Sequence, residues 1–421
     1  MTGRPDTAPP ASRLVATTTR LDADVDLSAV AGEDGVLFEQ RGTGLAGRGQ
    51  AVRVPLPVGP RRLAAAAGVV ADVLATIAVH DEVGLPGCGP VAFVALPFGD
   101  ATPASALVPA VVVGRADDGT RWMTTVGRPE DPPPRPQPVA PAHDRPHPPS
   151  RYRVAPGRPP SDWCHAVAAA VAALGPRGVA KVVLAREVVV EADAPLSVGA
   201  VLARLRAAYP SAMLYAVDGM VGASPELLVS RVGDVVRSHP MAGTAPRSGD
   251  PATDARGAAS LLASAKDRAE HQITIDMVLD TVLPFCSYVD SEPEPQVVSL
   301  ANAHHLASLV EGRLSAPPAP VLDLVAALHP TPAVCGWPRA EALALIGELE
   351  GLDRGRYTGP VGWVDARGNG RLAVAIRGAE LEGRRARLLA GGGIVADSDP
   401  AAELAETRLK LEAMLAAVIR P

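Results

Sequence analysis

The stretch between residues 357 and 394 restricts the possible folds most strongly. It reads YTGPVGWVDARGNGRLAVAIRGAELEGRRARLLAGGGI, so that apolar runs alternate with short polar turns. The Arg-Gly-Asn-Gly sequence at 367–370 is a hairpin signal, because glycine tolerates the positive φ of a tight turn. Hairpins join antiparallel strands, so this part predicts antiparallel pairing and not the parallel sheet of a doubly wound nucleotide fold. The three glycines at 391–393 form no dinucleotide fingerprint, since the G-x-G-x-x-G spacing is absent.

The remaining sequence mixes short strand-like runs with helical segments. Four runs before residue 126 predict strands around one helix at 61–80: DGVLFEQRG, AVRVPLPV, PVAFVALPF and LVPAVVVGR. Beyond residue 160, the pattern predicts a strand in AKVVLAREVVVEA and helices at 161–174, 257–283, 321–328 and 338–349. Antiparallel pairs with interspersed helices indicate an α+β fold.

A proline-rich stretch interrupts this pattern at 127–160. It contains too many prolines for a helix or a central strand, and we interpret it as an extended surface connection. The chain therefore divides into an N-terminal segment at 1–126, this connection, and a larger C-terminal region at 161–421.

Composition excludes several classes of protein. The 421 residues carry a net charge of −6 and contain no long basic block, which argues against an extended nucleic-acid surface. The four cysteines form no C-x-x-C pair, so neither a zinc site nor a disulfide framework is indicated. The N-terminus lacks an apolar signal segment, and no apolar run is long enough to span a bilayer. We expect a cytoplasmic protein without a membrane or nucleic-acid partner, and a monomer.

Two acidic pairs are candidates for a metal site. If the segment SAKDRAEHQITIDMVLD is helical, Asp267 and Glu270 lie on one face with apolar residues. Near the C-terminus, Glu403 and Glu406 repeat this spacing, followed by Lys410 on the same line. Mg²⁺ prefers such oxygen ligands. The spacing fits equally well a solvated face with ordinary helix-start electrostatics, and on spacing alone we favour that interpretation.

Ten motifs in one order resemble the chorismate-utilising enzymes. This family comprises isochorismate synthases, salicylate synthases, and the large subunits of anthranilate and aminodeoxychorismate synthases. The resemblance is close from Trp163 to the C-terminus and looser in the first third. The motifs are AKVVLARE, ASPELLVS, PMAGTAPR, KDRAEHQ, HHLASLVEG, HPTPAVCGWP, RYTGPVGWVD, VAIRGAEL, GGGIVADSDP and ELAETRLK. The resemblance implies a single large domain of two packed antiparallel β-sheets wrapped by α-helices. It also implies that the protein binds Mg²⁺.

The resemblance assigns the acidic residues and a catalytic pair. Glu270 and Glu406 match the family's direct metal ligands, and Asp267 and Glu403 would support them. Lys181 matches the general base that activates water for attack at C2 of the chorismate ring, although a strand lysine ordinarily points to solvent. Relatives that use ammonia lack this lysine, so no glutamine amidotransferase subunit is expected.

Glu226 in SPELL fits the proton donor for the departing C4 hydroxyl. Leucines follow it directly, and desolvation would keep such a glutamate protonated, although an acid after Pro225 also suits an ordinary turn.

Substrate binding falls to polar groups from several motifs. Arg377 lies in an apolar strand pattern, where an arginine without a carboxylate partner is costly, so it is assigned to the enolpyruvyl carboxylate. Tyr357 would donate to the same group, and His305 matches the position that contacts the ring carboxylate or leaving hydroxyl. The other residues assigned to the substrate are Gly243, Thr244, Thr331, Gly391, Gly392, Gly393 and Lys410.

The resemblance favours isochorismate synthase, which interconverts chorismate and isochorismate by adding water at C2 and removing the C4 hydroxyl. One alternative is a salicylate synthase, which continues by eliminating pyruvate; the HPTPAV motif at 329–334 looks more like synthases that stop at isochorismate. A non-catalytic chorismate-binding paralogue is the other. His304, Cys335 and Trp337 receive no role.

Overall fold

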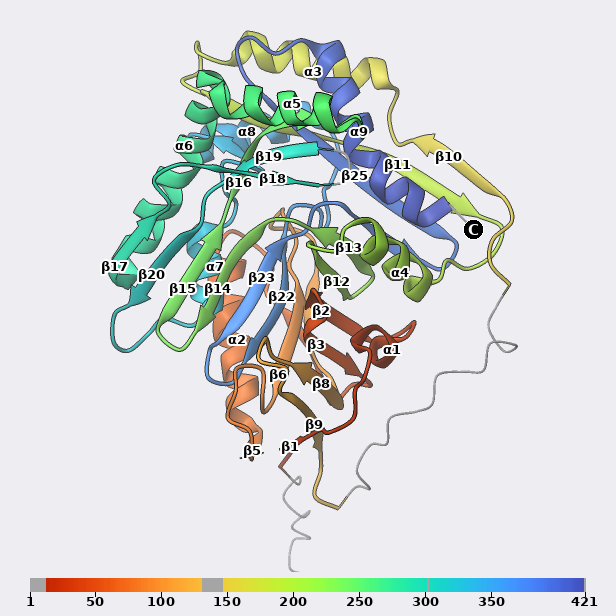
Figure 1. The fold of residues 1–421 in the computed structure, drawn as a ribbon, viewed down its shortest axis with the longest axis vertical. Helices are drawn as coiled ribbons and strands as arrows, with labels where there is room; N and C mark the ends of the chain where they lie inside the picture. Colours follow the sequence, from red (N-terminus) through yellow and green to blue (C-terminus); the bar gives the residue numbers. More distant parts are fainter. Residues whose placement is uncertain (1–12, 131–146, 301–302, 420–421) are drawn as a thin grey trace, which may run out of the picture.

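The structure is a computed structural model that describes residues 13–130, 147–300 and 303–419. Its strands form two large sheets and one small sheet, and helices cover the outer faces (Figure 1). The predicted α+β fold with two packed antiparallel sheets is therefore confirmed. Two features were not predicted: the small third sheet, and a parallel pairing of β1 with β5 at one edge.

The first sheet combines strands from both ends of the chain. Its order is β10-β11-β25-β24-β13-β12-β2-β3-β8-β9-β1-β5, with β21 attached to β11. The bounds are β1 Val15–Arg20, β2 Val36–Gln40, β3 Thr43–Arg48, β5 Ala78–Asp81, β8 Val111–Arg115, β9 Arg121–Gly127, β10 Tyr152–Pro156, β11 Lys181–Ala192, β12 Met213–Val217, β13 Met220–Ser224, β21 Gly336–Trp337, β24 Gly378–Glu382 and β25 Arg385–Ile394. The N-terminal segment is thus half of a shared sheet.

The second sheet runs β17-β20-β15-β14-β23-β22-β6-β7-β4, and the small sheet runs β16-β19-β18. The bounds are β4 Val52–Leu56, β6 Val91–Ala95, β7 Ala104–Val108, β14 Leu227–Val232, β15 Val235–His239, β16 Met241–Pro246, β17 Cys286–Ser291, β18 Gln296–Ser299, β19 Ala303–Ala307, β20 Val310–Leu314, β22 Pro360–Asp365 and β23 Gly370–Val374. The predicted turn at 367–370 joins β22 to β23, as expected.

The two large sheets pack face to face through one apolar core. Phe38 and Tyr215 from the first sheet meet Phe93 and Trp363 from the second within one buried cluster. Interdigitating side chains of two inner faces are the usual core of a β-sandwich. This core fixes the position of the strand ends that carry the site described below.

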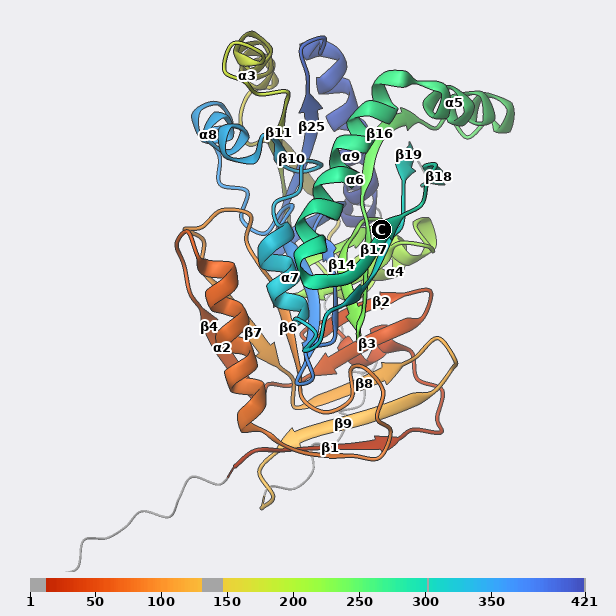
Figure 2. The same cartoon turned by 90° about the vertical axis from the view of Figure 1, so that its left-hand side faces the viewer.

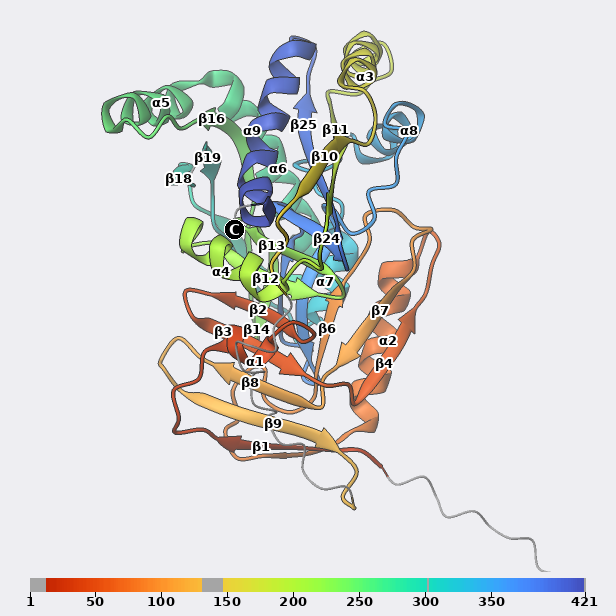
Figure 3. The same ribbon diagram turned by 90° about the vertical axis from the view of Figure 1, so that its right-hand side faces the viewer.

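Helices close the outer faces of both sheets. Those of the second sheet are α2 Arg62–Thr76, α6 Ala265–Val282 and α7 Val321–Leu328 (Figure 2). Against the first sheet lie α1 Leu27–Ala31, α3 Pro160–Ala173, α4 Val198–Ala208, α8 Arg339–Leu349 and α9 Pro400–Ile419, with α4 and α9 close together in Figure 3. The remaining helices are α5 Pro251–Ala263 and the short 3₁₀ helix Leu283–Phe285. No helix in the described ranges is long and apolar enough to cross a membrane.

Two sequence predictions about helices were wrong in detail. The helix predicted at 257–283 is two helices, because Ser264 ends α5 and caps α6 with its side chain, which accepts from the Asp267 N–H. The helix predicted at 61–80 ends at Thr76, after which β5 begins. The proline-rich connection, which was predicted to be extended, contains an edge strand, β10, which pairs with the second half of β11. Residues 131–146 of that connection lie outside the described residues.

Candidate active site

One cavity of about 280 Å³ gathers residues from both halves of the C-terminal region. Strand ends of the first sheet, the small sheet, and the first turns of α6 and α9 form its walls. Predicted site residues that line it are Lys181, Glu226, Gly243, Thr244, Asp267, Glu270, His305, Tyr357, Arg377, Gly391, Gly393, Glu403, Glu406 and Lys410. Positions spread over 230 residues of sequence thus meet in one place.

Lys181 is the first residue of β11 and is held with its side chain in the cavity. Its backbone pairs with Trp337 of β21 on one side, and Val183 pairs with Gly393 of β25 on the other. A Cβ at Gly393 would lie 2.6 Å from the Lys181 Cε, so a larger residue there would displace the end of the lysine side chain. Burial lowers the pKa of Lys181, although Glu270, whose carboxylate is 3.7 Å from the Nζ, opposes this shift. The lysine is thus buried, unlike most strand lysines.

Glu226 lies between β13 and β14 and is buried. Burial raises the pKa of its carboxyl to about 8, and the Met241 backbone N–H, Lys181 and Arg377 only partly offset this effect. The carboxyl group is therefore protonated at neutral pH. The same cavity holds a lysine whose pKa is lowered and a glutamate whose pKa is raised, which is a typical arrangement for acid–base chemistry.

Arg377 occupies a strained position and has no acidic partner. It follows β23 with φ of 53°, so it lies in the link to β24 and not within a strand as its apolar neighbours suggested. In the described chain no carboxylate forms an ion pair with its guanidinium, whose recorded contact is the His305 Nε2 at 3.3 Å. Among the described residues, the Arg377 Nε is buried without a hydrogen-bond partner. Burial lowers the pKa of Arg377. A buried arginine in this state requires an anionic ligand.

His305 supports Arg377 from the small sheet. The His305 Nδ1 lies 3.1 Å from the Gly243 carbonyl and 3.2 Å from the Thr244 hydroxyl. Burial, reinforced by Arg377 and Lys410, lowers the pKa of His305 to about 3, so the ring is neutral. With the Nδ1–H donated to the carbonyl, the Nε2 accepts from Arg377. The histidine therefore orients the arginine as well as lining the cavity.

Tyr357 and Gly391 form a second contact at the cavity wall. Burial raises the pKa of the Tyr357 hydroxyl, and the backbone N–H of Gly391 lies close to that oxygen. Gly391 also accepts a hydrogen bond from the Lys410 Nζ at 2.9 Å. Gly392 does not line the cavity, because alternate residues of β25 point to opposite faces. It packs against Glu403, whose carboxylate would lie 2.7 Å from a Cβ at this position.

The two acidic pairs face the cavity from two helices. Asp267 and Glu270 come from the first turns of α6, and Glu403 and Glu406 from those of α9. Glu406 pairs with Lys410 at 2.5 Å, and Glu403 accepts from the Ser398 hydroxyl at 2.7 Å. These acids are therefore not the solvated face that spacing alone favoured.

The donor set fits Mg²⁺ in its chemistry. Carboxylate oxygens from two helices converge on one cavity, and Mg²⁺ prefers such ligands with water and substrate completing its shell. In the described residues, however, no three His, Cys, Asp or Glu side chains form a ready ligand group. Glu270 and Glu406 instead contact Lys181 and Lys410. The carboxylates suit the ion. To bind it, Glu270 and Glu406 would have to give up their contacts with Lys181 and Lys410.

The structure leaves some predicted residues outside the cavity and explains others. Thr331 is buried and does not line the cavity, and its carbonyl accepts from the N–H groups of Val334 and Cys335. Trp337, exposed at its side chain, pairs with Lys181 through its backbone. The His304 Nδ1 lies 2.9 Å from the Ser299 hydroxyl.

Sequence reasoning missed several cavity residues. Lys266 lines the site beside Asp267, and its place one residue before the acidic pair was the available signal. Thr358 also lines it with a left-handed φ of 62°, and nothing in the sequence marks that strain. Met241, Ala333 and Val334 supply apolar walls without any motif chemistry.

Comparison with known proteins agrees with this geometry. A family model described as chorismate binding enzyme matches residues 137–419. A Mycobacterium tuberculosis protein named "Putative isochorismate synthase MenF" is 43% identical over 350 residues, covering 79% of this chain and 87% of the relative. The chain therefore belongs to the chorismate-binding enzyme family.

Two solved structures share the fold. A Bacillus anthracis protein described as a 2,3-dihydroxybenzoate-specific isochorismate synthase, DhbC, with that assignment given as putative, superimposes with a TM-score of 0.76 at 29% identity, covering 92% of this chain and 96% of its own. The menaquinone-specific isochorismate synthase MenF of Escherichia coli gives a TM-score of 0.79 over 98% and 96% of the two chains. At 22% identity the latter supports the fold alone.

Proposed function

We propose that this protein is an isochorismate synthase that interconverts chorismate and isochorismate. The observation that carries the proposal is the presence of buried Lys181 and Glu226 in one cavity that also holds Arg377, whose guanidinium forms no ion pair with an acid among the described residues. A base, an acid and an anion-binding group are the three functions that the reaction needs from side chains. The names of the relatives agree with this assignment.

Arg377 anchors the substrate. Its free guanidinium N–H groups bind the enolpyruvyl carboxylate, and the hydroxyl of Tyr357 reaches the same group. Gly243 and Thr244 face the ring carboxylate from the small sheet. Because His305 accepts from Arg377, the guanidinium is oriented before the substrate arrives, which reduces the entropy lost on binding.

Lys181 and Glu226 move the protons. Neutral Lys181 takes a proton from water as the water oxygen forms a bond to C2. The two conjugated ring double bonds shift towards C4, and the C4–O bond breaks. Glu226 gives its proton to the departing hydroxyl, which leaves as water. Lysine ends protonated and glutamate ionised, so one water is consumed and one released. The same pair runs the reverse reaction with the roles exchanged.

Mg²⁺ is part of the proposal. Glu270 and Glu406 would hold it, with Asp267 and Glu403 in support. When bound, the ion supplies positive charge at the ring carboxylate, where negative charge grows as the hydroxyl leaves.

Product analysis tests the assignment. Purified protein is incubated with chorismate and Mg²⁺, and the products are separated by chromatography. Isochorismate without pyruvate supports the proposal. Salicylate with an equal amount of pyruvate identifies the pyruvate-eliminating reaction instead, and unchanged chorismate indicates a binding protein without catalysis.

A parallel incubation with ammonium tests the nucleophile. We expect no aminated product and no need for a glutamine-hydrolysing partner, because the proposed role of Lys181 is to activate water. An aminated product would contradict this role. The cytoplasmic location and the monomeric state stay predictions.

A further inference from the structure

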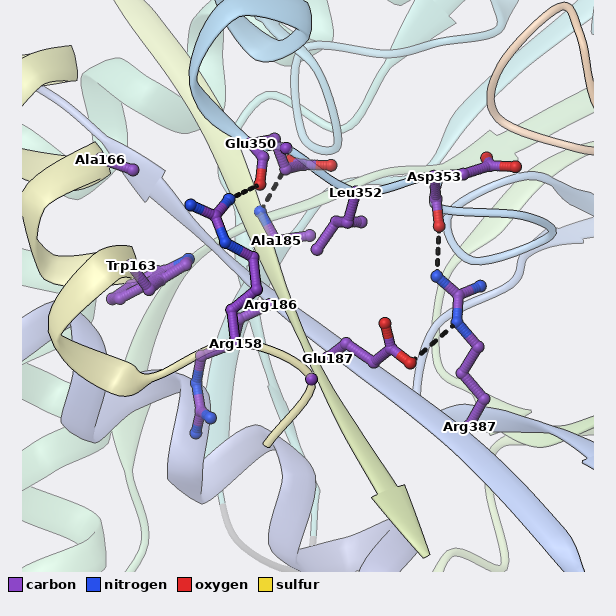
Figure 4. Close-up of a pocket in the computed structure, with 12 residues that line it drawn as sticks. Arg158, Trp163, Ala166, Ala185, Arg186, Glu187, Glu350, Leu352, Asp353 and Arg387 are labelled. Atoms are coloured by element: carbon purple, nitrogen blue, oxygen red, sulfur yellow. Dashed lines mark hydrogen bonds and ion pairs between the residues drawn. The ribbon is translucent and has the colours of Figure 1, made fainter. Parts of the chain in front are cut away.

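A second cavity, of about 380 Å³, opens at the edge of β11 and takes no part in the proposed reaction. The edge is open there because β21 covers only the start of β11 and β10 covers only its second half. Between them, the Ala185 N–H donates to the Glu350 carboxylate at 2.8 Å. Figure 4 shows this space between the first turn of α3 and the loop that follows α8. We name it the edge cavity.

The acids that line the edge cavity all have partners within the protein. Glu350 pairs with Arg354 at 2.6 Å, and Glu187 pairs with Arg387 at 3.3 Å. The Asp353 carboxylate accepts from the Gly355 N–H and the Thr102 hydroxyl. A cationic ligand would therefore find no free carboxylate in the lining.

The lining includes hydrogen-bond donors that are not fully used, among them Trp163 and Arg158. Trp163 is 6% exposed, and in the described chain its indole Nε1 has no hydrogen-bond partner. A buried donor without an acceptor is costly, so this N–H requires a ligand or water. Arg158, at the rim, has one recorded acceptor in that part of the chain, the Glu350 carbonyl at 2.7 Å, which leaves further N–H groups of its guanidinium available.

The other lining groups favour an apolar body. The Trp163 ring, Ala166 and Leu352 form walls of the cavity, and in Figure 4 they surround the same space as the Arg158 guanidinium. α3 begins beside Arg158 and has no side-chain cap, so its positive end adds to the preference for an anion. A small cavity with apolar walls and a few convergent donors is typical of a small-molecule site.

We propose that the edge cavity binds a small aromatic monocarboxylate, whose carboxylate accepts from Arg158 and the Trp163 indole. Its ring packs on Leu352 and Ala166. The edge cavity is separate from the cavity that holds Lys181, Glu226 and Arg377, which we name the reaction cavity. The two cavities share no lining residue. The proposal is independent of the reaction assigned above.

Isothermal titration calorimetry with benzoate tests the proposal, and benzamide serves as the uncharged analogue. A ligand of this size is expected to bind with a Kd on the order of 1 mM. Benzamide should bind about tenfold more weakly, because hydrogen bonds to a charged acceptor are stronger. Absence of saturation by benzoate at concentrations tenfold above that Kd overturns the site.

Four variants locate the binding. Trp163→Phe keeps the ring and removes only the N–H, and Arg158→Gln removes the guanidinium; each should weaken benzoate binding by about tenfold. Arg153→Gln is the matched control, since it removes a neighbouring positive charge that does not line the cavity. Arg377→Gln checks the reaction cavity. Loss of binding in Arg377→Gln with no change in Trp163→Phe and Arg158→Gln places benzoate in the reaction cavity and refutes the proposal.

Discussion

The buried charges of the reaction cavity and those beside the edge cavity differ in how they are paired. In the reaction cavity, Arg377 has no acidic partner within the described ranges, and burial keeps Glu226 neutral. Beside the edge cavity, Glu350 and Arg354 are each 2% exposed at their side chains and form a complete pair. Arg354 also donates to the carbonyls of Val183 and Val334 and lies 4.2 Å from the Phe98 ring centre. The comparison suggests that a buried charge without a protein partner, such as Arg377, binds a ligand. A fully paired one, such as Glu350 with Arg354, instead holds the fold beside the cavity.

Removing the base should have the largest effect. Lys181→Ala is expected to lower kcat about 10²–10⁴-fold, the range for loss of a positioned general base. Steady-state kinetics with chorismate measures this effect. Lys181→Met serves as the matched variant, because it keeps the length and packing of the side chain without the amine. Turnover close to wild type in either variant would remove the proposed mechanism.

Breaking the buried pair should change stability, not chemistry. Arg354→Met leaves Glu350 charged and buried without its partner, which is expected to cost about 3–5 kcal/mol of unfolding free energy. Arg177 is the matched control, because it pairs with Glu348 at 2.7 Å on the surface. Arg177→Met should cost at most about 1 kcal/mol.

Urea unfolding of both arginine variants measures this difference. Equal losses would show that burial of the Glu350–Arg354 pair does not matter.

The sequence predicted the elements of the site better than their surroundings. Lys181, Glu226 and the two acidic pairs were assigned from the resemblance to the chorismate-utilising enzymes, and the structure places them around one cavity. Local spacing alone could put each acidic pair on one helix face, but it could not bring the two helices together. Arg377 was identified by its chemistry, yet its left-handed φ comes from the link between β23 and β24, which depends on tertiary packing. The edge cavity was not predicted at all. It exists because β10 and β21 leave part of β11 uncovered, and no local pattern reports where a neighbouring strand ends.

The break between α5 and α6 shows a similar limit. Helical periodicity runs through 257–283, so the sequence predicted one helix. The structure ends the first helix at Ala263, and the Ser264 side chain caps the second. A serine inside a helical pattern was the available signal. This break places Asp267 and Glu270 in the first turns of α6, where both face the cavity.

Replacing one expected metal ligand should have a smaller effect than removing the base. Glu270→Gln should reduce activity about 10–100-fold at fixed Mg²⁺. Glu403→Gln should reduce it less, because its carboxylate is expected only to support the ligands.

Two measurements check the metal assignment. Titration of activity with Mg²⁺ after treatment with EDTA gives the apparent affinity, and the Mg²⁺-induced shift in Tm gives a readout independent of turnover. A Glu270→Gln protein with full activity in EDTA would contradict the assignment. An unchanged Mg²⁺ response in that variant would also contradict it, even if activity fell.

The smallest expected effect concerns the contribution of Glu226 to the stability of the protein. Its pKa is about 8 in the folded protein and near 4.5 in an unfolded chain, so between these values the folded state holds a proton that the unfolded state releases. The contribution of this glutamate to stability is therefore lost progressively as pH rises from 4.5 to 8. A glutamine at this position does not ionise, so its contribution to stability does not fall as pH rises. Glu226→Gln should thus match wild type in Tm near pH 4.5 and exceed it by about 2–5 °C at pH 8, while losing activity. Other titrating groups are common to both proteins and cancel in the Tm difference measured by calorimetry. A Tm difference that does not grow with pH would mean that Glu226 ionises normally, and it could then not be the proton donor at neutral pH.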